Sequence, residues 1–261
     1  MECAVPAGSG SPISKRVDTS SERAFHMSQL LNWLKSLYHR LPEPPSSLYC
    51  IRGASLDLPG LVPKNAVIYD IGSKSATGNY FGAYREGSKI ISVDIMEGPG
   101  VDLVADAHDL HMVADNSVDV VTSVSVMEHV RNPWKVVDEI YRILKPGGII
   151  CIDVPFIFPY HADPDDFYRF SNRGILNLCE KFECLQNGFS RGPASTMHHL
   201  LVHFFAILLS FNSRTIYGIN VDLFKWLFFW IKYLDKFIGN YSMAYVIHTG
   251  TYFVGRKPLS S

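Results

Sequence analysis

Between residues 65 and 190 the chain alternates short apolar runs with stretches in which apolar residues recur at helical spacing. The runs VDVVTSVSV and GGIICIDVPF are apolar on both faces, which is typical of strands in a parallel sheet that helices cover on both sides. The pattern predicts strands over 66–71, 89–94, 101–105, 118–124, 147–154 and 183–189, and helices over 76–86, 133–144 and 173–182.

Two further segments extend this alternating core. Residues 24–41 carry apolar residues at helical spacing and predict an amphipathic helix, which the prolines of LPEPP end. Residues 195–240 are dominated by Leu, Phe, Trp and Ile, and predict two helices before a last β run over 245–257. We therefore predict an α/β fold: a doubly wound, Rossmann-like, mostly parallel sheet of seven strands with a hydrophobic helical insertion before the last strand.

Composition narrows the class of protein. The Ser-, Gly- and Pro-rich residues 1–23 predict a disordered tail without an apolar signal segment, followed by one domain over 24–261. A net charge of −1 gives no basic field, so we expect no nucleic-acid partner. The five cysteines are scattered without a CxxC pair, which indicates reduced thiols, no zinc site and a cytoplasmic location.

Candidate cofactor chemistry is concentrated between residues 67 and 106. The apolar run over 67–69 leads through Asp70 and Gly72 into a Gly/Ser loop, and a second apolar run ends on Asp94. This layout is typical of a nucleotide-type cofactor that lies across the carboxyl ends of adjacent parallel strands. A dinucleotide site is disfavoured because G-x-G-x-x-G is absent.

The motifs YDIGSKSATG, SVDI, ADAHDLH, NSVDVVTSVSVMEHV and RILKPGGIICIDVP follow one another in the chain. In this order they resemble class I S-adenosylmethionine-dependent methyltransferases, of the methyltransferase type 11 kind. The resemblance covers residues 65–190 and implies S-adenosylmethionine as cofactor. It implies that the strand ends and their loops bind the cofactor through Asp70, Gly72, Ser73, Gly78, Asp94, Ile95, Asp106, Ala107 and Ser123. Within this set, Asp94 would bind the ribose hydroxyls, Asp106 with Ala107 the adenine, and Ser123 to Ser125 would face the sulfonium.

The glycine loop departs from the family's D-x-G-x-G-x-G pattern. Lys74 and Ala76 stand where the second and third glycines are expected, and Gly78 follows two residues later. The predicted function is methyl transfer to a small-molecule or lipid-like acceptor. The substituted loop leaves a second hypothesis open, a non-catalytic binding or scaffold protein with the same fold, associated with a membrane.

Candidate catalytic residues follow the fourth and fifth strands. His129 in VMEHV is a candidate general base, with a pocket wall or helix packing as the alternative. Some related quinone O-methyltransferases bind a divalent metal through E-x-x-E-H at this place, but Ser125 replaces the first acid, so we predict no metal. The segment PYHADPDDFYRFSNRG offers His161 and Asp166 as bases and Arg169 as an anion anchor, or else forms a structural turn.

The hydrophobic insertion allows several interpretations. The helical spacing of VDLFKWLFFWIKYLDKFI places Asp222, Lys225, Lys232, Asp235 and Lys236 on one polar arc opposite a face of Phe, Trp and Leu. The apolar face is expected to pack on a helix or second subunit, to contact a membrane peripherally, or to cover a hydrophobic acceptor. His199 and His203 share a helical face, where core packing is favoured over metal binding because the HExxH glutamate is absent.

Overall fold

The computed structural model describes residues 29, 61–72, 83, 86–162 and 164–259. The chain divides into a unit over residues 1–43 and a unit over 44–261, and the fold described below belongs to the second. The predicted tail over 1–23 lies outside the described residues. So do the predicted helix over 24–41 except Gln29, and the predicted helix over 76–86 except two of its residues.

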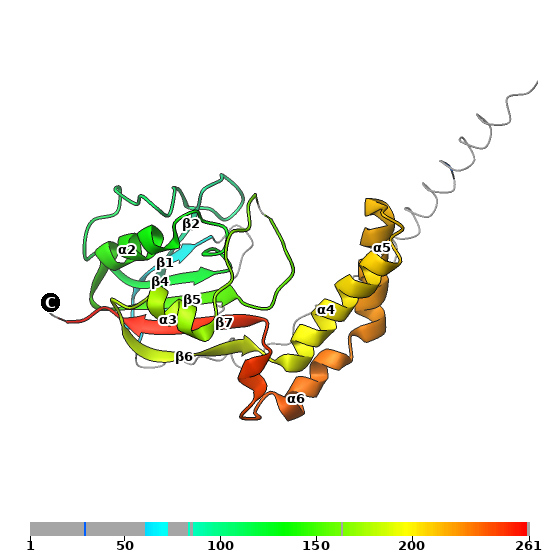
Figure 1. The fold of residues 1–261 in the computed structure, drawn as a ribbon. Helices are drawn as coiled ribbons and strands as arrows, with labels where there is room; N and C mark the ends of the chain where they lie inside the picture. Colours follow the sequence, from blue (N-terminus) through cyan, green and yellow to red (C-terminus); the bar gives the residue numbers. More distant parts are fainter. Residues whose placement is uncertain (1–28, 30–60, 73–82, 84–85, 163, 260–261) are drawn as a thin grey trace, which may run out of the picture. The chain divides into compact units, whose positions relative to one another are not determined.

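The second unit is built on a sheet of seven strands in the order β3-β2-β1-β4-β5-β7-β6. The first five strands run parallel, whereas β7 is antiparallel to both β5 and β6. This order confirms the predicted doubly wound, mostly parallel sheet (Figure 1). The strands are β1 (Val67–Ile71), β2 (Lys89–Asp94), β3 (Leu103–Val104), β4 (Val118–Val124), β5 (Leu144–Pro155), β6 (Glu183–Arg191) and β7 (Gly250–Arg256).

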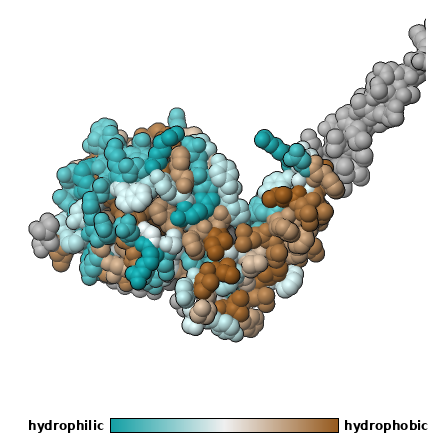
Figure 2. All heavy atoms as spheres, in the orientation of Figure 1, coloured by the Kyte–Doolittle hydropathy of each residue, from teal (hydrophilic) through white to brown (hydrophobic). Residues whose placement is uncertain are grey.

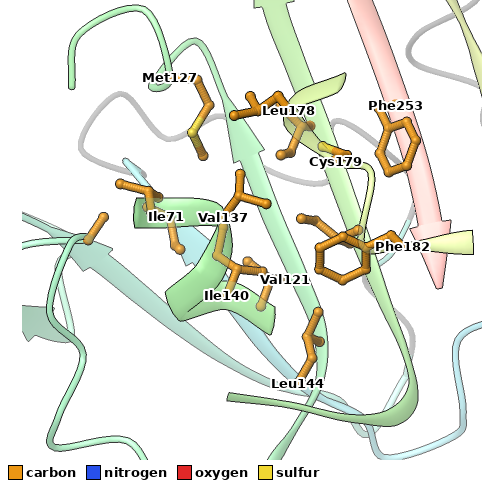
Figure 3. Packing of buried hydrophobic residues seen from close by; sticks show 14 of the residues in the cluster. Ile71, Val121, Met127, Val137, Ile140, Leu144, Leu178, Cys179, Phe182 and Phe253 are labelled. Carbon is orange, nitrogen blue, oxygen red and sulfur yellow. The ribbon is translucent and has the colours of Figure 1, made fainter. Parts of the chain in front are cut away.

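Helices α2 (Pro133–Ile143) and α3 (Asn172–Leu178) pack on one face of the sheet (Figures 1 and 3). The apolar stripe of α2, including Val137 and Ile140, buries its side chains against Val121 of β4. The opposite face of the sheet has a second cluster around Ile68 and Val120. Because successive strand residues point to opposite faces, both sides of β4 and β5 are apolar, as the sequence pattern required.

The segment before β7 is helical, as predicted. It contains α4 (Pro193–Leu208), α5 (Arg214–Phe228), the 3-10 turn η3 (Ile231–Leu234), α6 (Asp235–Ile238) and the 3-10 turn η4 (Ala244–Val246). Residues Val202 and Phe224 hold α4 and α5 together through a small apolar core of their own. We refer to residues 193–246 as the helical insertion.

The prediction of one polar arc over residues 221–238 is wrong. Helix α5 ends at Phe228, and the chain continues as η3 and α6, so the residues do not share one helical face. Lys232 and Asp235 are buried rather than solvated. The Asp235 carboxylate accepts hydrogen bonds from the amides of Ala194 and Ser195, both at 2.8 Å, and so satisfies the first turn of α4.

Candidate cofactor site

A cavity of about 870 Å³ opens at the carboxyl ends of β1, β2 and β4. In a doubly wound fold this edge of the sheet is where ligands bind, because the loops that follow the strands converge there. The sequence-predicted residues that line it are Gly72, Asp94, Ile95, Asp106, Ala107 and His129. Asp70, Ser123, His161 and Asp166 are not in the lining, and Ser73 and Gly78 lie outside the described residues.

Gly72 brings the backbone of the loop after β1 against the cavity wall. Its amide donates to the Val93 carbonyl at 2.8 Å, and its φ of +76° is a conformation that favours glycine. A Cβ at this position would lie 2.2 Å from Cγ2 of Val126. Asp70, two residues earlier, is buried in β1, where its Oδ1 accepts the Thr122 hydroxyl at 2.7 Å. Asp70 therefore supports the strand ends from within the sheet.

Two acidic side chains stand at the cavity from neighbouring segments. Asp94 ends β2, and its Oδ1 accepts the amide of Met96 at 3.0 Å, which fixes the turn that carries the carboxylate. Asp106 follows β3, and its Oδ1 accepts both the amide of His108 at 2.9 Å and the ring Nδ1 at 2.6 Å. Partial burial opposes ionisation of Asp106, but the His108 hydrogen bonds and the charge of Lys135 outweigh it and lower the pKa of the carboxyl.

The predicted role of Ser123 at the cavity needs correction. Ser123 lies inside β4 and is fully buried, whereas Ser125, just after the strand, lines the cavity. Ser125 has a φ of +55°, which is uncommon for a residue with a Cβ, and its amide donates to the Asp153 carbonyl at 2.9 Å. The end of β4 thus turns sharply at the cavity.

Beyond β4, His129 reaches the cavity wall, and His161 lies behind it. The two imidazole rings meet edge to face with centroids 5.0 Å apart. Both Nε2 atoms approach Oε1 of Glu128, at 3.7 Å for His129 and 3.6 Å for His161. The Glu128 carboxylate raises the pKa of His161, although burial opposes the effect.

The predictions of Asp166 as a base and Arg169 as an anion anchor are not supported. The Asp166 carboxylate is fully buried and bonded by both terminal nitrogens of Arg169, and it accepts the amide of His161 at 2.8 Å. The Arg169 guanidinium holds the pKa of this carboxyl well below its usual range. This ion pair organises the loop after β5, so the alternative interpretation of the segment as a structural turn is the better one for these two residues.

Phe167 and Arg131 also line the cavity, and neither was predicted from the sequence. Phe167 lines it from the loop after β5, and the Arg131 guanidinium lies 5.3 Å from the centre of the Phe167 ring. The aromatic residues of DDFYRF were the available signal, but their spacing does not show which one faces the cavity.

His199 and His203 lie in the helical insertion, away from the cavity lining. The ring of His199 stacks on Phe158, and Nδ1 of His203 forms a hydrogen bond with the Tyr217 hydroxyl.

Comparison with known proteins agrees with this geometry. Residues 70–152 match the family of methyltransferase domains. The human thiol S-methyltransferase TMT1B is 35% identical over 68 residues, which are 26% of each chain. An uncharacterized methyltransferase of Mycobacterium leprae is 31% identical over 105 residues, 36% of this chain and 38% of that one. The chain thus spans well under half the length of these curated relatives.

Solved structures give a looser likeness. A Haemonchus contortus phosphoethanolamine N-methyltransferase 2 in complex with S-adenosyl-L-methionine has a TM-score of 0.47 at 20% identity, covering 76% of this chain and 50% of that one. The structure of coclaurine N-methyltransferase has a TM-score of 0.48 at 12% identity, and the match covers 78% of this chain and 72% of that one. The family match over residues 70–152 and the strand order agree with the predicted class I S-adenosylmethionine-dependent methyltransferase domain over that part of the chain. S-adenosylmethionine is the methyl donor of that family.

Proposed function

We propose that this protein is an S-adenosylmethionine-dependent methyltransferase acting on a small-molecule or lipid-like acceptor. The observation that carries the proposal is the 870 Å³ cavity at the strand ends, which lies in the segment matching the methyltransferase domain family. Its volume falls in the range of ligand-binding sites. Two carboxylates stand at its wall, and Gly72 keeps the backbone close where a Cβ would not fit.

In this proposal each cavity residue has a separate task. The cofactor supplies a methyl group on a sulfonium. Asp94 accepts hydrogen bonds from ribose hydroxyls, which suits a carboxylate at the end of β2, and Asp106 with the Ala107 backbone binds the adenine amino group. Phe167 and Ile95 supply apolar walls that exclude water from the reacting groups. Ser73 and Gly78 remain proposed loop contacts outside the described residues.

His129 is the candidate catalytic residue that faces the acceptor side of the cavity. Its Nδ1 donates to the Asp165 carbonyl at 2.6 Å, and this bond leaves a lone pair on Nε2. That lone pair accepts a proton from an acceptor hydroxyl or thiol, or binds a cation. His161 does not line the cavity, and its ring packs edge to face against that of His129, so in this proposal it positions His129.

Calorimetric titration with S-adenosylmethionine and with S-adenosylhomocysteine tests the proposal. We expect micromolar binding that Asp94→Ala weakens at least about 10-fold, since one charge-assisted hydrogen bond contributes roughly 1.5–3 kcal/mol. Asp109→Ala is the matched control, because Asp109 is exposed and pairs with the exposed His111 away from the cavity. Equal heats for the wild type and Asp94→Ala would refute the assignment of Asp94. A folded protein without any heat would favour the scaffold hypothesis.

The helical insertion supports the lipid-like class of acceptor. Its surface exposes many large apolar side chains, which gather over α4, α5 and α6 (Figure 2). Among them are aromatic residues that favour a membrane–water interface: Trp226, Trp230, Phe237, Tyr241 and Tyr245. Among the described residues, no helix is long and apolar enough to cross a bilayer. We propose that this face rests on a membrane surface from the cytoplasmic side, in preference to a homo-oligomer contact.

Vesicle co-sedimentation tests the membrane contact. We expect the protein to pellet with phosphatidylcholine vesicles containing phosphatidylserine, and Leu227→Asp to reduce the bound fraction several-fold because it places a charge in the exposed apolar face. Met112→Asp, at an exposed apolar residue outside the insertion, should leave binding unchanged. Light scattering without lipid addresses the alternative: a dimer that Leu227→Asp dissociates, together with no vesicle binding, would assign the face to a second subunit.

A further inference from the structure

Glu128 is a buried carboxylate that accepts no hydrogen bond from the described residues. It follows β4, its side chain is fully buried, and within the described part of the chain neither carboxylate oxygen has a hydrogen-bond partner. An unpaired buried charge costs several kcal/mol, so such a group is protonated, paired with a cation or bound to a metal. The fold must therefore provide a partner for it.

The guanidinium of Arg169, whose positive charge lies near Glu128, is not that partner. An arginine has five N–H donors. Those of Arg169 are all engaged, by the Asp166 carboxylate and by the carbonyls of Phe158, Pro159 and Tyr168. Arg169 therefore has no donor left for Glu128.

Two imidazoles present lone pairs to Glu128 instead. The Nδ1 of His129 lies 2.6 Å from the Asp165 carbonyl, and the Nδ1 of His161 lies 3.1 Å from the Pro159 carbonyl. A carbonyl oxygen can only accept, so each Nδ1 carries the proton and each neutral ring has its lone pair on Nε2. Carbonyl acceptors behind the ring orient metal-binding histidines in the same way.

The distances suit ligands of a common ion better than hydrogen bonds. The Nε2 atoms lie 3.7 and 3.6 Å from Oε1 of Glu128, too long for a hydrogen bond. Two ligands of one tetrahedral zinc ion, each about 2.1 Å from it, lie roughly 3.4 Å apart. One ligand atom from each of the three residues falls within 4.8 Å of the others.

We propose that Glu128, His129 and His161 bind a divalent transition-metal ion of the zinc type. Two imidazoles and one carboxylate favour such an ion over magnesium or calcium, which prefer oxygen ligands. His129 also lines the cofactor cavity, so the ion adjoins the proposed reaction site. With the ion bound, Nε2 of His129 is a ligand rather than a proton acceptor. Binding of the ion itself requires neither cofactor nor methyl transfer.

Metal titration of the full chain after chelator treatment tests the proposal. We expect one equivalent of Zn²⁺ by calorimetry, and a Co²⁺ complex with visible absorption bands of a tetrahedral or five-coordinate site. Glu128→Gln and His161→Gln should each weaken binding on the order of 100-fold. The matched controls are His111→Gln, at an exposed histidine paired with Asp109, and His203→Gln, at a histidine of the helical insertion. Both should bind like the wild type.

Thermal unfolding separates loss of a ligand from loss of the fold. Wild-type protein should be stabilised by Zn²⁺, whereas Glu128→Gln should fold in chelator at least as stably as the wild type and gain nothing from the metal. The wild-type titration alone can refute the proposal, by showing no bound equivalent. Binding that Glu128→Gln retains, or that the control variants lose equally, would also overturn it. Destabilisation of Glu128→Gln in chelator with no metal effect on the wild type would assign the cluster to a Glu128–His161 ion pair.

Discussion

Single residues at the strand ends decide the shape of the cavity. Gly72 turns the chain with a φ of +76°, and Ser125 turns it with a φ of +55° at the end of β4. Asp94 and Asp106 are each held by the backbone amide of a residue two positions later. Their carboxylates are thereby oriented before any ligand binds, which reduces the entropy that binding costs.

Replacement of Gly72 by alanine should disrupt this arrangement. The added Cβ would meet Val126 at 2.2 Å and would also occupy an unfavourable φ. We expect Gly72→Ala to lose measurable cofactor binding and to unfold at lower denaturant concentration than the wild type. Gly100→Ala is the control that measures the cost of the positive φ without a steric clash. Gly100 has a φ of +82°, but no described atom lies within 4 Å of the added Cβ. It should cost only about 1 kcal/mol and keep binding. Similar losses in both variants would contradict the steric explanation.

At the scale of elements, the helical insertion depends on a polar contact between distant segments. Helix α4 begins after Gly192, which provides no side-chain cap, and Asp235 at the start of α6 accepts the α4 amides in its place. Thr196 of α4 bonds the Thr249 hydroxyl at 2.8 Å, next to the start of β7. These buried contacts tie the insertion to the end of the sheet.

Removal of the Asp235 carboxylate should therefore destabilise the protein. Asp235→Ala leaves two buried amides at the start of α4 without their acceptor, and we expect a loss of about 3 kcal/mol in denaturant unfolding. Asp222→Ala removes the carboxylate of a half-buried i,i+3 pair with Lys225 and should change stability by less than about 1 kcal/mol. An Asp235→Ala variant as stable as Asp222→Ala would show that Asp235 does not anchor α4.

On the scale of the whole molecule, burial favours the neutral form of three histidines in the helical insertion and the approach to β7. Burial lowers the pKa of His199 to about 3, and it also lowers the pKa values of His203 and His248. Each histidine titrates near 6.5 in the unfolded chain, so below that pH the unfolded state binds protons that the folded state does not. Stability from these residues is therefore present above pH 6.5 and is lost as the pH falls toward 3.

Acid unfolding measures this coupling. Between pH 6 and 5 we expect the free energy of unfolding to fall, by up to about 1.4 kcal/mol per pH unit for each such histidine. His199→Gln should reduce the slope by up to one proton, because a glutamine does not titrate. A wild-type slope of zero in this window would show that the buried histidines do not control acid stability.

The sequence by itself determined the order of the elements and three of the residues at the strand ends that line the cavity. Apolar runs and helical spacing depend on local chain geometry, so they predicted the seven-stranded sheet and the helical insertion before β7. Motifs at strand ends predicted Gly72, Asp94 and Asp106, because parallel strands bring their carboxyl ends to one edge.

Tertiary structure alone decided which polar residues meet. Helical spacing placed Asp235 in solvent, but the break after Phe228 buries it against α4, some 40 residues earlier in the chain. Asp166 resembled a base in sequence, yet Arg169 and the His161 amide enclose it. Glu128 and His161 converge from loops after different strands, and such distances depend on strand order and loop path, which no local pattern encodes.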